Sequence, residues 1–300
     1  MDAADCDGKA ASDPLLRPAI SAVRDLGHQV EVRVTFESGD AARYAGEAAS
    51  EGVEVVVAAG GDGTINEVAG GLLATGISGN TAMGVIPYGT ANDFATGTGV
   101  LKGDPLKALR LAATGAATPI DVGKVNEHIF VNVASGGFGA EVTANIPPQL
   151  KKAIGGAAYS LMGIVTAAKM SPYQCRFTAP DGTTEDGTVL IMAVGNGRQS
   201  GGGYQVTPHA LLNDGLLDVV VIHDAEITQL GTVLGELLDL QAKSNQFVSY
   251  RQVASLELES TTPLQLNLDG EPYRGTRFHF TVMPGALPFI LGPDAPLKTN

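Results

Sequence analysis

Cysteine is scarce in this chain of 300 residues, where Cys6 and Cys175 are the only two. Two cysteines without metal-ligand spacing exclude a disulfide framework and indicate a reducing compartment. The first fourteen residues hold four aspartates and no apolar stretch, so they cannot serve as a secretory signal peptide. Together these absences predict a cytoplasmic protein.

Long apolar runs and positive charge are also in short supply. The most apolar helix-like segment, residues 153–168, is below the roughly 20 residues needed to span a bilayer, so we expect no transmembrane helix. Lysine and arginine number 19 against 32 aspartates and glutamates, a formal net charge of −13. This balance argues against nucleic acid as the main partner and limits any contact with anionic membranes to a transient one.

The chain does have a hydrophobic content of 44%, enough for a substantial core, and a length that favours two domains. Up to about Ala117, helix-like and strand-like stretches alternate, as in an α/β layer. After about Ile120, short alternating strands predict antiparallel sheets with one buried face. The expected elements are helix 15–26, strand 30–35, helix 40–50, strand 53–59, a helix entered at Thr64, strand 83–86 and helices 150–169 and 227–243.

A glycine-rich loop, residues 60–63, separates the second expected strand from the helix that follows. Thr64 and Glu67 have the spacing of a capping box, which predicts that the helix begins at Thr64. Glycines allow close approach of an anion, and amides at a helix N-terminus favour phosphate oxygens. The loop therefore fits a nucleotide phosphate, although a plain tight connection explains the glycines equally well.

A second polar loop, Pro87 to Ala95, follows the next expected strand. Ligands of open α/β sheets bind at the carboxyl ends of strands, where neighbouring loops converge. We therefore expect both loops to line one crevice, although Asp93 alone could be a helix cap.

In the β-rich half, the segment NLDGE at 267–271 ends an alternating strand. Asp-Gly between two strands is a common hairpin turn, but a turn does not require Glu271.

Four motifs in register resemble the YegS-like lipid kinases of the diacylglycerol kinase superfamily. They are GGDGTINE at 60–67, GTANDFA at 89–95, GNGRQSGGG at 195–203 and NLDGE at 267–271. The resemblance runs from about Leu15 to near the C-terminus. It implies an α/β ATP-binding domain over 1–120, to which 283–300 returns, and a β-sandwich lipid domain over 121–282, with ATP in the cleft between them.

Carried over by position, the resemblance implies a set of ATP contacts and no lysine in the glycine loop. These contacts are Thr35, Gly61, Asp62, Gly63, Thr64, Ile65, Asn66, Glu67 and Thr90. It implies that Glu271 is the base that accepts the proton of the acceptor hydroxyl, with Asp269 beside it as a supporting group.

The resemblance also implies a metal site in the second domain, distinct from the Mg²⁺ that accompanies ATP. Its ligands would be the Asp214 carboxylate and the carbonyl oxygens of Leu211 and Leu216. Oxygen ligands of this kind suit Mg²⁺ or Ca²⁺. An Asn-Asp-Gly turn is the simpler explanation of the same residues.

One departure from the family pattern lies at the N-terminus. Family members normally begin with a strongly apolar strand, whereas this chain begins MDAADCDGKAASDP. We expect the parallel sheet to lose buried apolar area and the nucleotide cleft to lose one wall.

Three functions fit these features. The first is an ATP-dependent lipid kinase whose acceptor is phosphatidylglycerol-like. The second is a soluble-metabolite kinase related to the NAD kinases, which share the GGDG loop. The third is a non-catalytic, nucleotide-binding regulatory protein.

Overall fold

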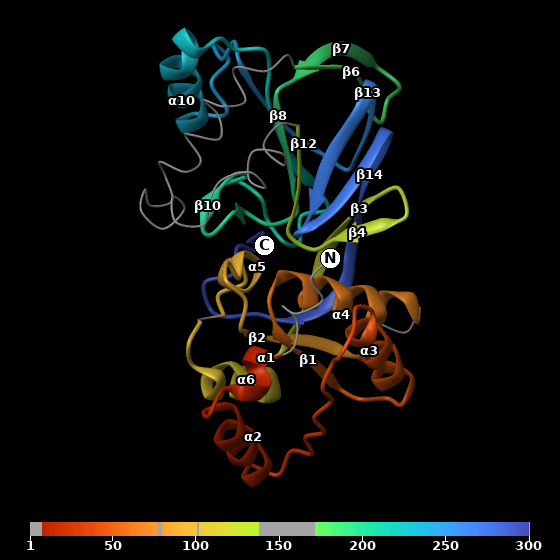
Figure 1. The fold of residues 1–300 in the computed structure, drawn as a ribbon, viewed down its shortest axis with the longest axis vertical. Coiled ribbons are helices and arrows are strands. Elements are labelled where there is room, and N and C mark those ends of the chain that lie inside the picture. Colours follow the sequence, from red (N-terminus) through yellow and green to blue (C-terminus); the bar gives the residue numbers. More distant parts are fainter. Residues whose placement is uncertain (1–7, 77–79, 101, 138–171, 300) are drawn as a thin grey trace. The chain divides into compact units, whose positions relative to one another are not determined.

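The computed structural model describes residues 8–76, 80–100, 102–137 and 172–299 (Figure 1). The chain divides into two compact units. The first unit runs to Val122 and takes in Leu212–Asp214 and the residues from Met283 onward, and the second comprises Gly123–Leu211 and Gly215–Val282.

The first unit is an α/β layer, as predicted. β1 (Val55–Gly60) pairs in parallel with β2 (Ala82–Pro87), and the end of β14 (Glu271–Ile290) continues the sheet on the other edge of β2. Figure 1 shows α4 and α6 on opposite sides of these strands. The helices are α1 Gly8–Ser12, α2 Leu16–Asp25, α3 Asp40–Ser50, α4 Asp62–Ala74, α5 Asp93–Gly97 and α6 Pro105–Thr114.

Apolar residues at helical spacing explain why α3 forms where the sequence predicted it. Ala41, Ala45 and Ala49 recur at helical intervals and are buried, so the helix has one apolar face, and it packs mainly against α4 and to a lesser extent against β1. At its start, the Asp40 carboxylate accepts the Phe36 N–H at 3.0 Å. That bond satisfies a backbone donor in the turn that leads into the helix.

The expected strand at 30–35 is absent, since residues 28–36 have no regular secondary structure. The segment forms no ladder with β1, which is the terminal strand of the described sheet. Arg33 instead contacts α3 through Glu47, at 2.8 Å. The period-2 pattern identified residues that suit a strand but could not supply a partner strand.

The second unit is rich in antiparallel strands and forms the predicted β-sandwich-like half. Its strands are β3 Ala117–Val125, which begins in the first unit, β4 His128–Phe130, β5 Val133–Gly137, β6 Tyr173–Thr178, β7 Thr184–Val189, β8 Ile191–Gly195, β9 Gln199–Ser200, β10 Tyr204–Gln205, β11 Leu217–Ile222, β12 Val248–Val253, β13 Ser255–Leu268 and β14. The main path runs β14-β13-β5-β8-β11-β12, and β6 pairs with both β13 and β7.

The core of this unit lies on the alternating face of β13. The five leucines that alternate along this strand, at 256, 258, 264, 266 and 268, are all buried. They pack with Phe130, Phe278 and Phe280. Burying a side chain of this size stabilises a fold by about 1.5–3 kcal/mol, so this strand holds the sandwich together.

The predicted helix 227–243 is shorter than expected. It consists of a 3₁₀ turn, η2 (Ile227–Gln229), followed by α10 (Leu230–Leu238). The buried Glu236 carboxylate accepts backbone N–H groups of residues 246–248 at 2.8–2.9 Å, which turns the chain back toward β12. The predicted helix 150–169 lies outside the described residues, and in the described part of the chain no helix is long and apolar enough to cross a membrane.

Two exposed apolar residues in the segment that forms no strand, together with the unprotected edge of β1, predict self-association. Val34 and Phe36 are 42% and 79% exposed, and β1 has neither charge nor proline to protect its edge. We expect the double variant Val34→Lys/Phe36→Asp to scatter less light at high protein concentration while keeping the wild-type melting temperature. Leu238→Asp is the control, because Leu238 is a 90% exposed residue elsewhere. Equal scattering by all three proteins would contradict this reading.

Candidate active site

Two loops lie against each other where β1 and β2 end. The Tyr88 N–H donates to the Gly60 carbonyl oxygen at 2.9 Å. A Cβ added to Gly89 would lie 2.6 Å from the Cα of Gly61. The two backbones can therefore approach this closely only because both positions are glycine.

The N-terminus of α4 opens directly from the first of these loops. Gly61 precedes the helix, which begins at Asp62, and no side chain caps it. First-turn amides have no partner within a helix, and the helix dipole gives them positive partial charge. The capping box predicted from Thr64 to Glu67 is therefore wrong, because the helix begins before Thr64.

Glu67 does not close a capping box but bonds to the turn before α3. Its carboxylate accepts hydrogen bonds from the Gly39 N–H at 3.1 Å and the Ser38 hydroxyl at 3.3 Å. The contact ties α4 to the turn that precedes α3. Thr35 lies just before this turn, in the segment that forms no strand.

Asp62 joins the two loops. Its carboxylate accepts the Phe94 N–H at the start of α5, at 3.4 Å. Burial is the main cause that raises the pKa of Asp62 above its usual value; the Phe94 N–H opposes this rise, and the charge of Asp93 adds to it. A carboxylate kept in an unfavourable environment of this kind is typical of functional sites.

Asn92 shapes the second loop. It is fully buried in the left-handed region, with φ of 55°, and its Nδ2 donates to the Gly89 carbonyl at 2.7 Å. In the described part of the chain its Oδ1 has no hydrogen-bond partner. Thr90, inside this loop, is exposed.

The side chains of Asp13 and Lys102 contact this loop from other parts of the chain. The Tyr88 hydroxyl donates to Asp13 at 2.8 Å, and burial, together with Asp13, raises the pKa of Tyr88 well above its usual value. Lys102 Nζ lies 3.1 Å from the Gly89 carbonyl oxygen and 3.2 Å from that of Thr90. No sequence pattern predicted this position of Lys102, because a lone lysine in a loop has no characteristic spacing.

In the second unit, NLDGE forms the hairpin turn between β13 and β14. Asp269 and Gly270 have φ of 51° and 110°, and Leu268 pairs with Glu271. A two-residue loop with both φ positive is the type I′ form, so the hairpin interpretation is confirmed. Glu271 is the first residue of β14, and it is exposed.

Asp269 is buried and holds a neighbouring segment. Its carboxylate accepts the N–H groups of Val131 at 2.6 Å, Asn132 at 3.1 Å and Val133 at 3.0 Å. A carboxylate bonded to three backbone donors acts mainly on the structure of the turn. These hydrogen bonds go to residues 131–133 and not to Glu271.

The predicted metal ligands Leu211, Asp214 and Leu216 lie in one loop before β11. Within it, the Asn213 Oδ1 accepts the Lys298 N–H at 2.6 Å. Across the described ranges, no three His, Cys, Asp or Glu side chains gather into a metal site. The predicted set is of another kind, one carboxylate with two carbonyl oxygens, and such donors suit hard cations.

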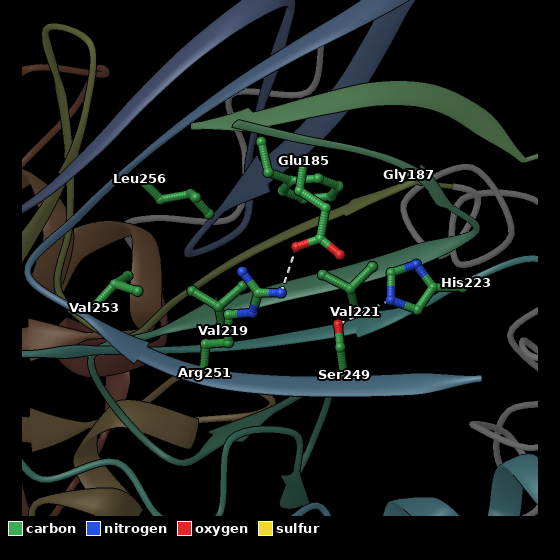
Figure 2. A pocket seen from close by; sticks show the side chains of 10 residues that line it. Glu185, Gly187, Val219, Val221, His223, Ser249, Arg251, Val253 and Leu256 are labelled. Carbon is green, nitrogen blue, oxygen red and sulfur yellow. Dashed lines mark hydrogen bonds and ion pairs between the residues drawn. The ribbon is translucent and has the colours of Figure 1, made fainter. Parts of the chain in front are cut away.

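Figure 2 shows a separate hollow in the second unit, with a volume of about 70 Å³. His223 Nδ1 lies 2.7 Å from the Thr188 carbonyl oxygen, so this nitrogen donates, and Nε2 lies 2.9 Å from the Ser249 hydroxyl. Arg251 and Glu185 form an ion pair beside it. Ligand pockets are typically about 300–1,000 Å³, so this hollow holds no whole ligand, and it includes none of the predicted site residues.

Comparison with known proteins agrees with the two units. Residues 6–125 match the diacylglycerol kinase catalytic domain, and residues 132–291 match the YegS C-terminal NAD kinase beta sandwich-like domain. A protein of Chromohalobacter salexigens named "Probable lipid kinase YegS-like" is 44% identical, covering 94% of this chain and 90% of its own length. A protein of the same name from Cronobacter sakazakii is 42% identical, covering 97% of this chain and 96% of its own length.

Solved structures show the same fold. A diacylglycerol kinase from Bacillus anthracis has a TM-score of 0.73 and 25% identity, with 93% of this chain and 90% of that one covered. An NAD kinase from Archaeoglobus fulgidus in complex with ATP has a TM-score of 0.51 over 94% and 91%, at 12% identity, and so shows the fold alone. The chain belongs to the diacylglycerol kinase catalytic-domain family, in its YegS-like branch. It is therefore a kinase, a phosphotransferase.

Asp62→Asn should stabilise the protein at neutral pH. Because the folded-state pKa of Asp62 is raised, the folded state binds this proton more tightly than the unfolded state, and wild-type stability falls as pH rises through that pKa. Asparagine lacks this dependence. Urea unfolding should show the variant more stable at pH 7.5, with the difference shrinking as the pH falls.

Asp294→Asn, at an exposed carboxylate of the same unit, is the control and should match wild type at both pH values. A destabilised Asp62→Asn variant at pH 7.5 would show that the charge of Asp62 supports the fold.

Asp269→Asn should destabilise the second unit. The side-chain NH₂ would face the N–H donors of residues 131–133 that the carboxylate now satisfies, and a buried donor without a partner costs about 1–3 kcal/mol. We expect a lower urea midpoint, whereas Asp224→Asn, at an exposed position, should leave it unchanged. A wild-type midpoint for Asp269→Asn would disprove the role of this carboxylate.

Proposed function

We propose that the protein is a lipid kinase that transfers the γ-phosphate of ATP to the hydroxyl group of a phospholipid, phosphatidylglycerol-like in chemistry. The observation that carries the proposal is the uncapped N-terminus of α4 beside two glycines that bring the loops together. The names of the similar proteins, which specify a lipid kinase, support the acceptor class.

The residues of the first unit fit a nucleotide phosphate. A Cβ at Gly60 would meet the Thr64 side chain, and Gly61 and Gly89 lie against each other, so these glycines let both loops close up beside the N-terminus of α4, and helix N-terminal amides bind phosphate oxygens. In this proposal the γ- and β-phosphates lie against this loop. The contacts are then made by Thr35, by residues 61–67 and by Thr90.

Glu271 is proposed as the general base. Its carboxylate accepts the hydroxyl proton of the lipid while the hydroxyl oxygen attacks the γ-phosphorus. The bond from that phosphorus to the β–γ bridging oxygen breaks, and ADP leaves. Its exposed place beside the β13–β14 hairpin turn supports this role, because the carboxylate is accessible and the turn is held by the hydrogen bonds that the Asp269 carboxylate accepts from residues 131–133.

Metal ions complete the proposal. Mg²⁺ bound with ATP would neutralise charge on the phosphates during transfer. A second ion, Mg²⁺ or Ca²⁺, would be held by Asp214 and the carbonyl oxygens of Leu211 and Leu216. These oxygen donors have the chemistry that such ions require.

Glu271→Gln tests the base. Loss of a positioned base lowers turnover by about 10²–10⁴, so we expect kcat to fall by that factor while the Kd for ATP is unchanged. Phosphate transfer from labelled ATP to vesicles containing phosphatidylglycerol measures the first, and calorimetry measures the second. Glu257→Gln changes an exposed carboxylate of β13 and should retain wild-type activity.

The same assay separates the alternatives. Wild-type turnover by Glu271→Gln would refute the assigned base. Transfer to diacylglycerol vesicles but not to phosphatidylglycerol would correct the acceptor, and transfer only to NAD would identify a soluble-metabolite kinase. ATP binding by the wild-type protein without transfer to any acceptor would identify a regulatory protein.

A further inference from the structure

Lys102 brings a positive charge to the second loop of the site. Its side chain is exposed, and it lies in the connection between α5 and α6. Nζ lies 3.1 Å from the Gly89 carbonyl oxygen and 3.2 Å from the Thr90 carbonyl oxygen. The ammonium group is therefore placed at the loop that contains Thr90, a proposed ATP contact.

The loop does not depend on this lysine for its shape. The Gly89 carbonyl oxygen also accepts a hydrogen bond from the Asn92 side chain at 2.7 Å, which is shorter than the bond from Lys102. Asn92 is fully buried, whereas Lys102 is exposed. The buried asparagine thus supports the same carbonyl from inside, and a purely structural role for Lys102 would be redundant at Gly89.

The chemistry of an ammonium group leaves capacity for a ligand. A protonated lysine carries three N–H donors and no acceptor. The two loop carbonyls use two of these donors and hold the charge in place. The third donor suits an anionic oxygen, such as one of a phosphate group.

The charges around the loops make a cation here useful. Asp93 raises the pKa of Asp62 through its negative charge, so two carboxylates lie close together in the loops proposed to hold a triphosphate. The chain carries a formal net charge of −13, and the motif GGDGTINE at 60–67 contains no lysine or arginine. A triphosphate bound here would meet repulsion that a nearby ammonium group reduces.

We propose that Lys102 is a phosphate-binding residue that replaces a lysine within the glycine loop. Nζ holds the carbonyl oxygens of Gly89 and Thr90 and donates its third N–H to a phosphate oxygen of ATP. This inference rests on the proposed function and assigns a further binding residue to the same site. It concerns affinity for the phosphates, because no bond is made or broken at Lys102.

Calorimetric titration with ATP, ADP and adenosine tests the proposal. A hydrogen bond to a charged group contributes enough that its loss weakens binding by roughly tenfold or more. We expect Lys102→Met to weaken ATP and ADP by about that factor and to leave adenosine unchanged. Lys102→Arg keeps the charge and should restore most of the affinity for ATP.

Lys107→Met is the matched control. Lys107 is an exposed lysine on α6 that pairs with Asp104 at 3.3 Å, away from the loop carbonyls. Its substitution should leave the affinity for all three ligands at the wild-type value. Thermal unfolding should show that each variant is folded.

Two results would overturn the inference. Wild-type affinity for ATP in Lys102→Met would show that the ammonium group contacts no phosphate. Equal weakening of ATP, ADP and adenosine would show that Lys102 only supports the loop. The wild-type titration separately tests the proposed function, because a wild-type protein that binds no nucleotide would refute that function and the inference together.

Discussion

The close approach of two backbones at Gly61 and Gly89 is the constraint on which the site depends. It holds the loops after β1 and β2 against each other and allows the Asp62 carboxylate to reach the start of α5. A side chain at either glycine would separate the loops. The uncapped N-terminus of α4 and the second loop therefore lie side by side because two glycines pack against each other.

Two neighbouring carboxylates of the second unit have different surroundings. Asp269 lies in the turn, is buried and accepts hydrogen bonds from three backbone donors, whereas Glu271, the first residue of β14, is exposed. An exposed carboxylate is accessible, as the proposed base must be. A carboxylate that must hold a backbone segment has to be enclosed, because burial is what makes its hydrogen bonds strong.

Asp62 illustrates the cost of such an arrangement. Its burial disfavours the charged form, and Asp93 adds to that cost, yet both carboxylates belong to the loops that identify the family. Sites of this kind accept local instability, which the packed interior offsets elsewhere. Here Phe94 and Phe289 pack edge to face at 5.4 Å, next to the same loops.

Local patterns predicted much of this protein. Helical spacing placed α2 and α3, alternation placed β13, and Asp-Gly identified its hairpin, because each of these depends on residues near one another in sequence. The patterns failed where contacts with residues distant in sequence determine the structure. The segment 30–35 has the residues of a strand but does not pair with the free edge of β1. The tertiary structure likewise decided that Glu67 bonds to Gly39, that Asp269 holds residues 131–133 and that Lys102 reaches Gly89. These contacts join residues far apart in the chain, and only folding sets which of them meet.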